Sequence, residues 1–181
     1  MTMAEPESPP GTRKPFPLQL HVLHLDQDDP KKCTAKKLKK FGFVRLHPTL
    51  RTVPVQSIKL DPYADTVMSI MDRDIILRHG LTVIDCSWNE ASSVFKNMRL
   101  KNGRRLSVIF LAGNPINYAM PGKLSSVEAF AAALIITGFF EEAEVLLSKF
   151  TWGHTFLELN KPRIGEIKAE LASRGIKPAR P

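Results

Sequence analysis

The sequence predicts an α/β protein whose first part contains a mainly parallel sheet and whose second part is helical. Short apolar segments of strand-forming residues alternate with helical segments up to residue 112, as in a parallel sheet covered by helices. Beyond residue 112 the segments are helical only. We therefore expect a leader (1–17), an α/β part (18–112) and a helical part (113–181).

The leader is expected to be disordered. It contains five prolines and one bulky apolar side chain apart from methionine, Phe16, so it cannot bury enough surface to offset the entropy of ordering.

The first two elements have clear local signals. Residues 18–25 alternate apolar and polar side chains as in a half-buried strand. A basic helix is expected at 30–40, with Asp29 as its N-cap, Pro30 at its first position and Gly42 beyond its end.

Proline-containing turns separate the next two predicted strands, 43–46 and 53–60, which end before His47–Pro48 and Asp61–Pro62. A helix at 72–79 is expected to end at Gly80. The remaining elements of this part are a strand at 81–84, a helix at 88–95 capped by Ser87, and a strand at 106–112.

The helical part begins after a loop rich in glycine and proline. Its first helix is expected to be capped by Ser125 or Ser126, with Glu128 in its first turn, and to end at Gly138. A second helix at 141–153, a short turn and a third helix at 163–175 follow.

Composition excludes several classes of protein. With 181 residues, 43% of them hydrophobic, the chain can bury a core without cross-links. Its two cysteines provide neither a disulfide framework nor a four-cysteine metal site, which indicates a reducing cytoplasm. No apolar run approaches the roughly 20 residues of a membrane span, and the N-terminus does not resemble a signal peptide.

Charge points to a phosphate-rich partner. The 26 Lys and Arg exceed the 18 Asp and Glu, which gives a formal net charge of +8. Residues 30–60 carry nine basic side chains and no acidic one, and residues 91–127 carry six and none. Such clusters supply the phosphate contacts of a nucleic-acid-binding protein, although a solvated basic face is the alternative.

Few motifs carry chemistry on their own. No two glycines are two residues apart, so the dinucleotide-binding fingerprint and the phosphate-binding P-loop are absent. The histidines and cysteines lack metal-ligand spacing, so no metal is expected. Asp85 ends a buried strand, where ligands gather in α/β sheets, and Trp88 follows it. A helix cap and a core tryptophan are the alternative interpretations.

The loop after residue 112 has two interpretations. Its sequence GNPINYAMPG presents Asn114, Asn117 and Tyr118 between prolines, which suits recognition of a base or a ribose. A rigid connector is the other interpretation.

Several segments, in their order and spacing, resemble the small-subunit ribosomal RNA aminocarboxypropyltransferase family over about residues 20–162. They are HLDQDDPKKCTAKKL, RLHPTL, LDP, IDCSW, AGNPINYAMPGKLSSVEAFAAAL and FTWGHTFLELN.

The resemblance implies an enzyme that transfers the 3-amino-3-carboxypropyl group of S-adenosylmethionine to a (methyl)pseudouridine in small-subunit rRNA during ribosome biogenesis. It also implies a SPOUT-like knotted fold and an archaeal origin. Asp85 matches the family's motif acid near the reaction centre, and we expect it to be the catalytic residue, either as the base for the acceptor imide nitrogen or as an orienting group. The implied cofactor-binding residues are Thr34, Leu60, Pro62, Ile84, Trp88, Ala91, Val108, Gly122 and Ser126.

RNA binding is assigned to the two basic clusters. The residues expected to contact the RNA are Lys31, Lys32, Lys36, Lys37, Lys40, Arg45, Arg104 and Arg105. We expect a cytoplasmic protein, a monomer, with small-subunit rRNA or a pre-ribosomal particle as its partner and no membrane partner. A SPOUT-type RNA methyltransferase and a non-catalytic rRNA-binding assembly factor are the alternatives.

Overall fold

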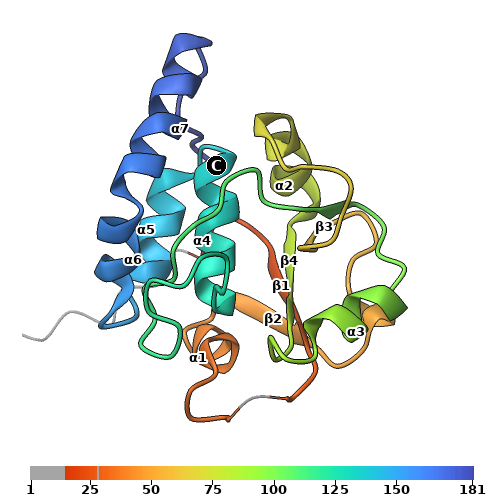
Figure 1. Cartoon of the computed structure of the whole chain (residues 1–181). Coiled ribbons are helices and arrows are strands. Elements are labelled where there is room, and N and C mark those ends of the chain that lie inside the picture. Colours follow the sequence, from red (N-terminus) through yellow and green to blue (C-terminus); the bar gives the residue numbers. More distant parts are fainter. Residues whose placement is uncertain (1–14, 28) are drawn as a thin grey trace, which may run out of the picture.

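The computed structural model describes residues 15–27 and 29–181. Most of the predicted leader therefore lies outside the described residues. Five parallel strands form one sheet in the order β2-β1-β4-β3-β5, which confirms the predicted α/β class (Figure 1). The strands are β1 (Leu20–His24), β2 (Val44–His47), β3 (Ile58–Leu60), β4 (Leu81–Asp85) and β5 (Gly103–Arg104).

Alternating side chains of β1 and β4 divide the core between the two faces of the sheet. Val22 and Val83 belong to the main core cluster, whereas Leu23 and Ile84 belong to a smaller cluster on the other face. Helix α3 (Ala91–Asn97) contributes to the smaller cluster. The main cluster includes side chains of α1 (Thr34–Lys40), α2 (Arg73–His79) and α4 (Ser126–Ile136).

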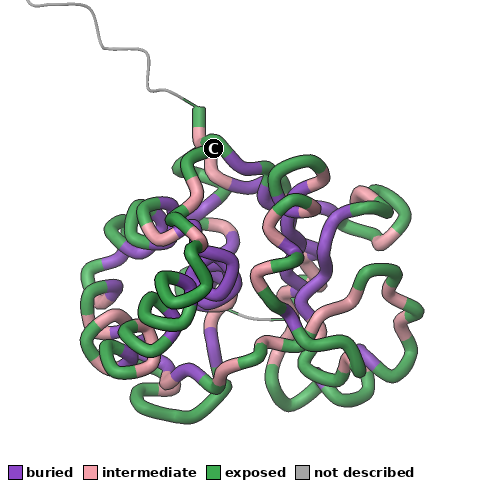
Figure 2. Tube along the Cα trace, turned by 90° about the horizontal axis from the view of Figure 1, so that it is seen from above, coloured by how far each residue is buried: buried purple, intermediate pink, exposed green. Residues whose placement is uncertain are grey.

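Helix α4 is the centre of the main core. Ten of its eleven residues are buried, and it contacts both α1 and β4. Figure 2 shows that the buried residues run through the middle of the molecule. The helices α5 (Phe140–Leu147), α6 (Gly153–Leu159) and α7 (Lys161–Ser173) follow α4. The main core thus joins residues from both predicted parts, from Leu18 to Leu171.

The predicted glycine ends of two helices and the predicted cap of α4 are confirmed. Helix α2 ends at Gly80 and α4 is followed by Gly138, both with φ of 82°, a conformation that glycine adopts without strain. Ser125 precedes α4, and its backbone N–H donates to Glu128 at 2.9 Å.

The predicted start of the basic helix is wrong. The helix begins at Thr34 with Cys33 at the N-cap, because residues 30–32 form a turn. Asp29 closes that turn by accepting hydrogen bonds from the backbone N–H groups of Lys31 and Lys32, each at 3.0 Å. The helix predicted at 88–95 likewise starts later, at Ala91, and its N-cap is Glu90 and not Ser87.

Two predicted strands are also wrong in extent. The strand predicted at 53–60 is limited to Ile58–Leu60, because a turn closed by the bond from Ser57 N–H to Pro54 O precedes it. Residues 106–112 are not a strand. They form an irregular segment, and the edge strand β5 lies just before it.

The helical part contains one helix more than predicted. The second predicted helix ends at Leu147, and the segment expected to be a short turn forms α6 and the start of α7. Asn160 lies between α6 and α7 and is completely buried. Its side chain exchanges two hydrogen bonds of 2.8 Å with the backbone of Leu111. In the described part of the chain, no helix is long and apolar enough to cross a membrane.

Candidate active site

A pocket of about 1080 Å³ lies where the carboxyl ends of β3 and β4 meet the N-termini of α1 and α4. Its walls come from segments that are far apart in the sequence: 29–37, 60–62, 83–95, 104–129 and Trp152. The carboxyl edge of a parallel sheet is the usual ligand site of α/β proteins.

The structure brings together every residue that was assigned to catalysis or to the cofactor. All ten of them line this pocket: Asp85, Thr34, Leu60, Pro62, Ile84, Trp88, Ala91, Val108, Gly122 and Ser126. Their individual roles stay predictions.

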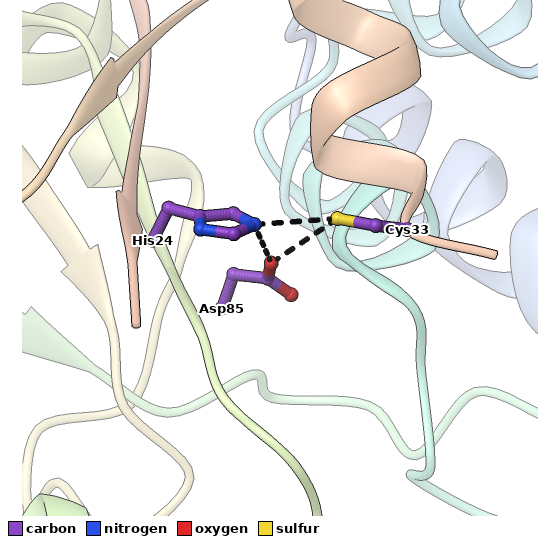
Figure 3. Close-up of side chains that lie close together, drawn as sticks. All are labelled: His24, Cys33 and Asp85. Carbon is purple, nitrogen blue, oxygen red and sulfur yellow. Dashed lines mark hydrogen bonds and ion pairs between the residues drawn. The ribbon is translucent and has the colours of Figure 1, made fainter. Parts of the chain in front are cut away.

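Both carboxylate oxygens of Asp85 accept hydrogen bonds, and Figure 3 shows the contacts with Cys33 and His24. The Ser126 hydroxyl donates to its Oδ1 at 2.9 Å, and the Cys33 thiol donates to its Oδ2 at 3.5 Å. The Nε2 atom of His24 lies 3.3 Å from the same Oδ2 and 3.5 Å from the Cys33 sulfur. The contacts fix the orientation of the carboxylate at the end of β4.

The group of His24, Cys33 and Asp85 was missed by sequence reasoning, because its members come from three elements. Burial, and then the charge of Asp85, raises the pKa of the Cys33 thiol, so the thiol is protonated and serves as a donor. The three ligand atoms lie within 4.8 Å of one another, and zinc accepts all three donor types. Hydrogen bonding already accounts for the arrangement, and the absence of a metal stays a prediction.

Two further contacts place polar groups at the pocket wall. The backbone N–H of Val127 donates to the Thr34 hydroxyl at 3.3 Å, which leaves the Thr34 proton available as a donor. The indole N–H of Trp88 donates to the Leu124 carbonyl at 3.3 Å. This bond holds the tryptophan, 38% exposed, against the segment that leads into α4.

Glu128 organises the loop on the other side of the pocket. Its side chain is fully buried and accepts hydrogen bonds from Gly113 N, Asn114 N and the Asn114 amide at 2.6, 3.1 and 2.7 Å. Asn114 Oδ1 in turn accepts from the backbone N–H groups of Ile116 and Asn117. Sequence reasoning identified Glu128 as a first-turn acid but not as the anchor of this loop.

The predicted RNA-binding residues divide into two groups. Lys31, Lys32, Lys37, Arg104 and Arg105 line the pocket, whereas Lys36, Lys40 and Arg45 do not.

Several basic side chains of the two clusters are engaged within the protein, and Arg105 is one of them, because its Nε donates to the Ala64 carbonyl at 3.3 Å. Lys36 pairs with Asp26 at 3.2 Å, and Arg104 pairs with Asp72 at 3.0 Å. Lys59, counted in the first basic cluster, is buried and donates to three backbone carbonyls, and burial lowers its pKa to about 8. Lys59 is therefore not part of the surface charge.

The fold and the site together define an α/β protein with a ligand pocket at the carboxyl edge of a parallel sheet and basic side chains around it. The family "Ribosome biogenesis protein, C-terminal" matches residues 58–179. The family "Possible Fer4-like domain in RNase L inhibitor, RLI" matches residues 18–51. This second segment contains one cysteine, Cys33, so it lacks the four thiolates that hold an iron–sulfur cluster.

Curated relatives carry one common name. The 16S rRNA aminocarboxypropyltransferase of Methanosarcina mazei is 44% identical over 160 residues, which cover 88% of this chain and 91% of the relative. The protein of the same name from Thermoplasma acidophilum is 45% identical over 83% of this chain and 90% of its own. The solved structure of the SAM-dependent rRNA:acp-transferase Tsr3 from Vulcanisaeta distributa superposes with a TM-score of 0.77 and is 37% identical, covering 88% of this chain and 90% of that one. The chain belongs to the family of 16S rRNA aminocarboxypropyltransferases.

Proposed function

We propose that the protein transfers the 3-amino-3-carboxypropyl group of S-adenosylmethionine to a pseudouridine or methylpseudouridine of small-subunit rRNA. The observation that carries this proposal is the single pocket in which all ten predicted site residues meet. Family membership supplies the reaction class.

The residues of the pocket fit S-adenosylmethionine. Its volume of about 1080 Å³ is at the upper end for small-molecule sites, so a nucleoside-sized donor leaves room for an acceptor base. Asp85 offers a carboxylate to a cationic group, and the Trp88 indole provides a face that attracts a cation. Leu60, Val108 and Ala129 supply apolar wall.

The donor's sulfonium makes the attached carbons electrophilic, so that the acceptor nitrogen forms a bond to the aminocarboxypropyl carbon while the carbon–sulfur bond breaks and methylthioadenosine leaves. The role of the protein is to orient the donor so that the aminocarboxypropyl carbon, and not the methyl carbon, faces the acceptor nitrogen. Asp85 is the candidate to take the proton that the acceptor imide nitrogen loses. Its Oδ1 accepts a hydrogen bond from the Ser126 hydroxyl. Its other oxygen, Oδ2, contacts the Cys33 thiol and His24 Nε2.

The RNA would be held by the basic residues at the rim. Lys31, Lys32 and Lys37 line one side of the pocket, and Arg105 and Lys123 line another. All five side chains are exposed. Phosphate contacts from these side chains would position a loop nucleotide whose base enters the pocket.

We also propose the knotted SPOUT-like topology for this chain, and that it works in the cytoplasm as a monomer. The path of the chain supports the knot. From β5 at one edge of the sheet the segment 105–125 returns to α4, which packs over β4 and beside α1.

The experiment that tests the function uses two labels. The protein is incubated with unmodified small-subunit rRNA and with S-adenosylmethionine labelled either in the carboxyl group or in the methyl group. We expect the carboxyl label to enter the RNA and the methyl label to stay out. Incorporation of the methyl label alone would identify a methyltransferase. If neither label enters the RNA, even when the RNA already carries the methylpseudouridine, the protein is a non-catalytic assembly factor.

A second experiment tests the placement of the RNA on α1. Lys37 and Lys40 are exposed on this helix, so the double replacement Lys37→Glu and Lys40→Glu should weaken RNA binding and reduce the slope of log Kd against log salt by about 2. Affinity for S-adenosylmethionine should change little. An unchanged salt slope would remove α1 from the RNA interface.

A further inference from the structure

We infer that the loop 114–120 is a base-stacking subsite, on which Tyr118 and Ile116 hold an unpaired nucleotide next to the acceptor. This inference rests on the proposed function and extends it by naming the part of the RNA that the loop recognises. It assigns a role to residues outside the predicted RNA-binding set.

Exposed apolar side chains concentrate in this part of the chain. Ile109 and Ile116 are each 66% exposed, Tyr118 is 60% exposed and Met120 is 39% exposed. They are four of the twelve large apolar side chains exposed in the described part of the chain. Ile109 and Ile116 line the pocket, as does Asn117 beside Tyr118. Such a cluster beside a ligand pocket marks a binding surface.

The loop presents these side chains on a fixed backbone. Figure 1 shows the loop where the chain approaches the start of α4. Its ends are joined by backbone hydrogen bonds from Ala119 to Ala112 at 2.7 Å and from Ala112 to Met120 at 3.1 Å. The buried Glu128 side chain accepts hydrogen bonds from the backbone N–H and the side-chain amide of Asn114 at the start of the loop. A preformed loop loses little conformational freedom when a ligand binds.

Tyr118 differs from the other tyrosine in what its ring contacts. Tyr63 packs on Phe95 with ring centroids 5.8 Å apart. Within the described residues, the Tyr118 side chain has neither a ring contact nor a hydrogen bond. An exposed aromatic ring without such contacts offers a free face on which a base can stack.

The charge around the loop selects a nucleic acid as the occupant. No acidic residue occurs between residues 91 and 127. Lys123 is exposed and lines the pocket three residues after the loop's end at Met120, and Lys31 and Lys32 line the pocket as well. An aromatic side chain next to cations provides stacking for the base and charge for the phosphate, which is how single-stranded nucleic acids are bound.

The test compares two fluorescein-labelled RNAs, one with an unpaired loop on a stem and one fully paired duplex of the same stem. Tyr118→Ala should weaken binding of the looped RNA about tenfold, with little change for the duplex. Tyr118→Phe should bind the looped RNA as the wild type does, because the ring face remains. Lys123→Ala should reduce the salt slope by about 1, whereas Tyr118→Ala should leave the slope unchanged.

The matched control is Met71→Ala, because Met71 is 79% exposed and lies outside the pocket lining. The subsite is refuted if Tyr118→Ala binds the looped RNA like the wild type, if it weakens the duplex equally, or if Tyr118→Phe loses as much affinity. A wild-type protein that binds neither RNA and transfers no label would instead refute the proposed function.

Discussion

Among single residues, Asp85 is the one whose surroundings are most closely tied to the proposed chemistry. Ser126 and Cys33 each donate to one oxygen of its carboxylate. An asparagine side chain has nearly the same shape and keeps one of these two acceptors. Asp85→Asn should therefore preserve the shape of the pocket while removing the proton acceptor. We expect the transfer rate at saturating S-adenosylmethionine to fall by about 10²-fold or more.

Single-turnover kinetics would measure that rate, with calorimetry for donor affinity. The conservative control is Cys33→Ser, which retains a donor toward Asp85 and should stay within a few-fold of the wild type. If Asp85→Asn turned over at the wild-type rate, apposition of the two substrates alone would account for catalysis.

The neighbouring histidine and thiol lead to a prediction about metal. His24, Cys33 and Asp85 satisfy one another by hydrogen bonds, so dialysis against EDTA should change neither the melting temperature nor the transfer rate. Loss of transfer after EDTA and its recovery on adding zinc would instead identify the three side chains as metal ligands.

Glu128 is the residue whose replacement should most destabilise the loop beside the pocket. Glu128→Ala would leave the buried donors of Gly113 and Asn114, and the half-buried donors of Ser125, without their acceptor. We expect the free energy of unfolding to fall by about 3 kcal/mol, measured by urea denaturation. Glu144→Ala, an exposed acid on α5, should change it by about 0.5 kcal/mol or less. Equal effects of the two variants would contradict the role of Glu128 as the anchor of the loop.

At the level of elements, β1 and β2 are joined by a buried histidine pair. His21 Nδ1 and His47 Nε2 share a hydrogen bond of 3.0 Å, and His21 Nε2 has no hydrogen-bond partner within the described residues. Burial, and then the nearby His47, lowers the pKa of His21 to about 4, and burial also lowers the pKa of His47. The folded protein therefore keeps this pair neutral.

This pair makes stability depend on pH in a defined direction. An unfolded histidine binds a proton below about pH 6.5, whereas folded His21 resists protonation until about pH 4. The unfolded state thus binds more protons between these values, and stability falls as the pH decreases. Relative to His21→Gln, the wild type should lose roughly 2 kcal/mol more between pH 7 and pH 4.5, measured by urea denaturation. Parallel curves would contradict the prediction, and His154→Gln, an exposed histidine, should follow the wild type.

Helices and strands of this fold differ in how far the sequence predicts them. The ends of α2 and α4 follow from Gly80 and Gly138, because a positive φ is a local requirement. Residues 106–112 are apolar enough for a strand, but side-chain and backbone contacts from distant Asn160, Met120 and Gly122 occupy their backbone groups. Helix α6 was not predicted for a similar reason. It has no side-chain cap at its N-terminus, and its buried residue Phe156 packs against a distant part of the chain.

The family resemblance predicted site residues from several distant segments, and all of them line the pocket. Without the resemblance, the site was predictable only where one motif holds the relevant residues. Asp85 and Trp88 were found because they directly follow a buried strand. His24 and Cys33 were not associated with Asp85, because spatial proximity between β1, α1 and β4 depends on the order of strands in the sheet. The separation of surface lysines from buried Lys59 likewise required the three-dimensional structure.

For the molecule as a whole, the pocket connects the α/β part with the helical part. Its walls include residues from α1 and β4 on one side and from α4 and Trp152 on the other. A ligand in this pocket contacts both parts, so its binding should stabilise the entire chain against unfolding. Because ligand binds only the folded state, a concentration 100 times Kd adds about 2.7 kcal/mol.

S-adenosylmethionine at that concentration should therefore raise the melting temperature by roughly 5–10 °C for a domain of this size. Trp88→Ala should reduce the shift at the same concentration, because the indole that Leu124 O holds in the pocket wall is lost. Val145→Ala, which replaces an exposed side chain outside the pocket lining, should retain the full shift. Differential scanning fluorimetry over a range of donor concentrations measures all three. A melting temperature that does not rise with the donor would mean that the pocket does not bind S-adenosylmethionine, whereas equal shifts for both variants would place the donor away from Trp88.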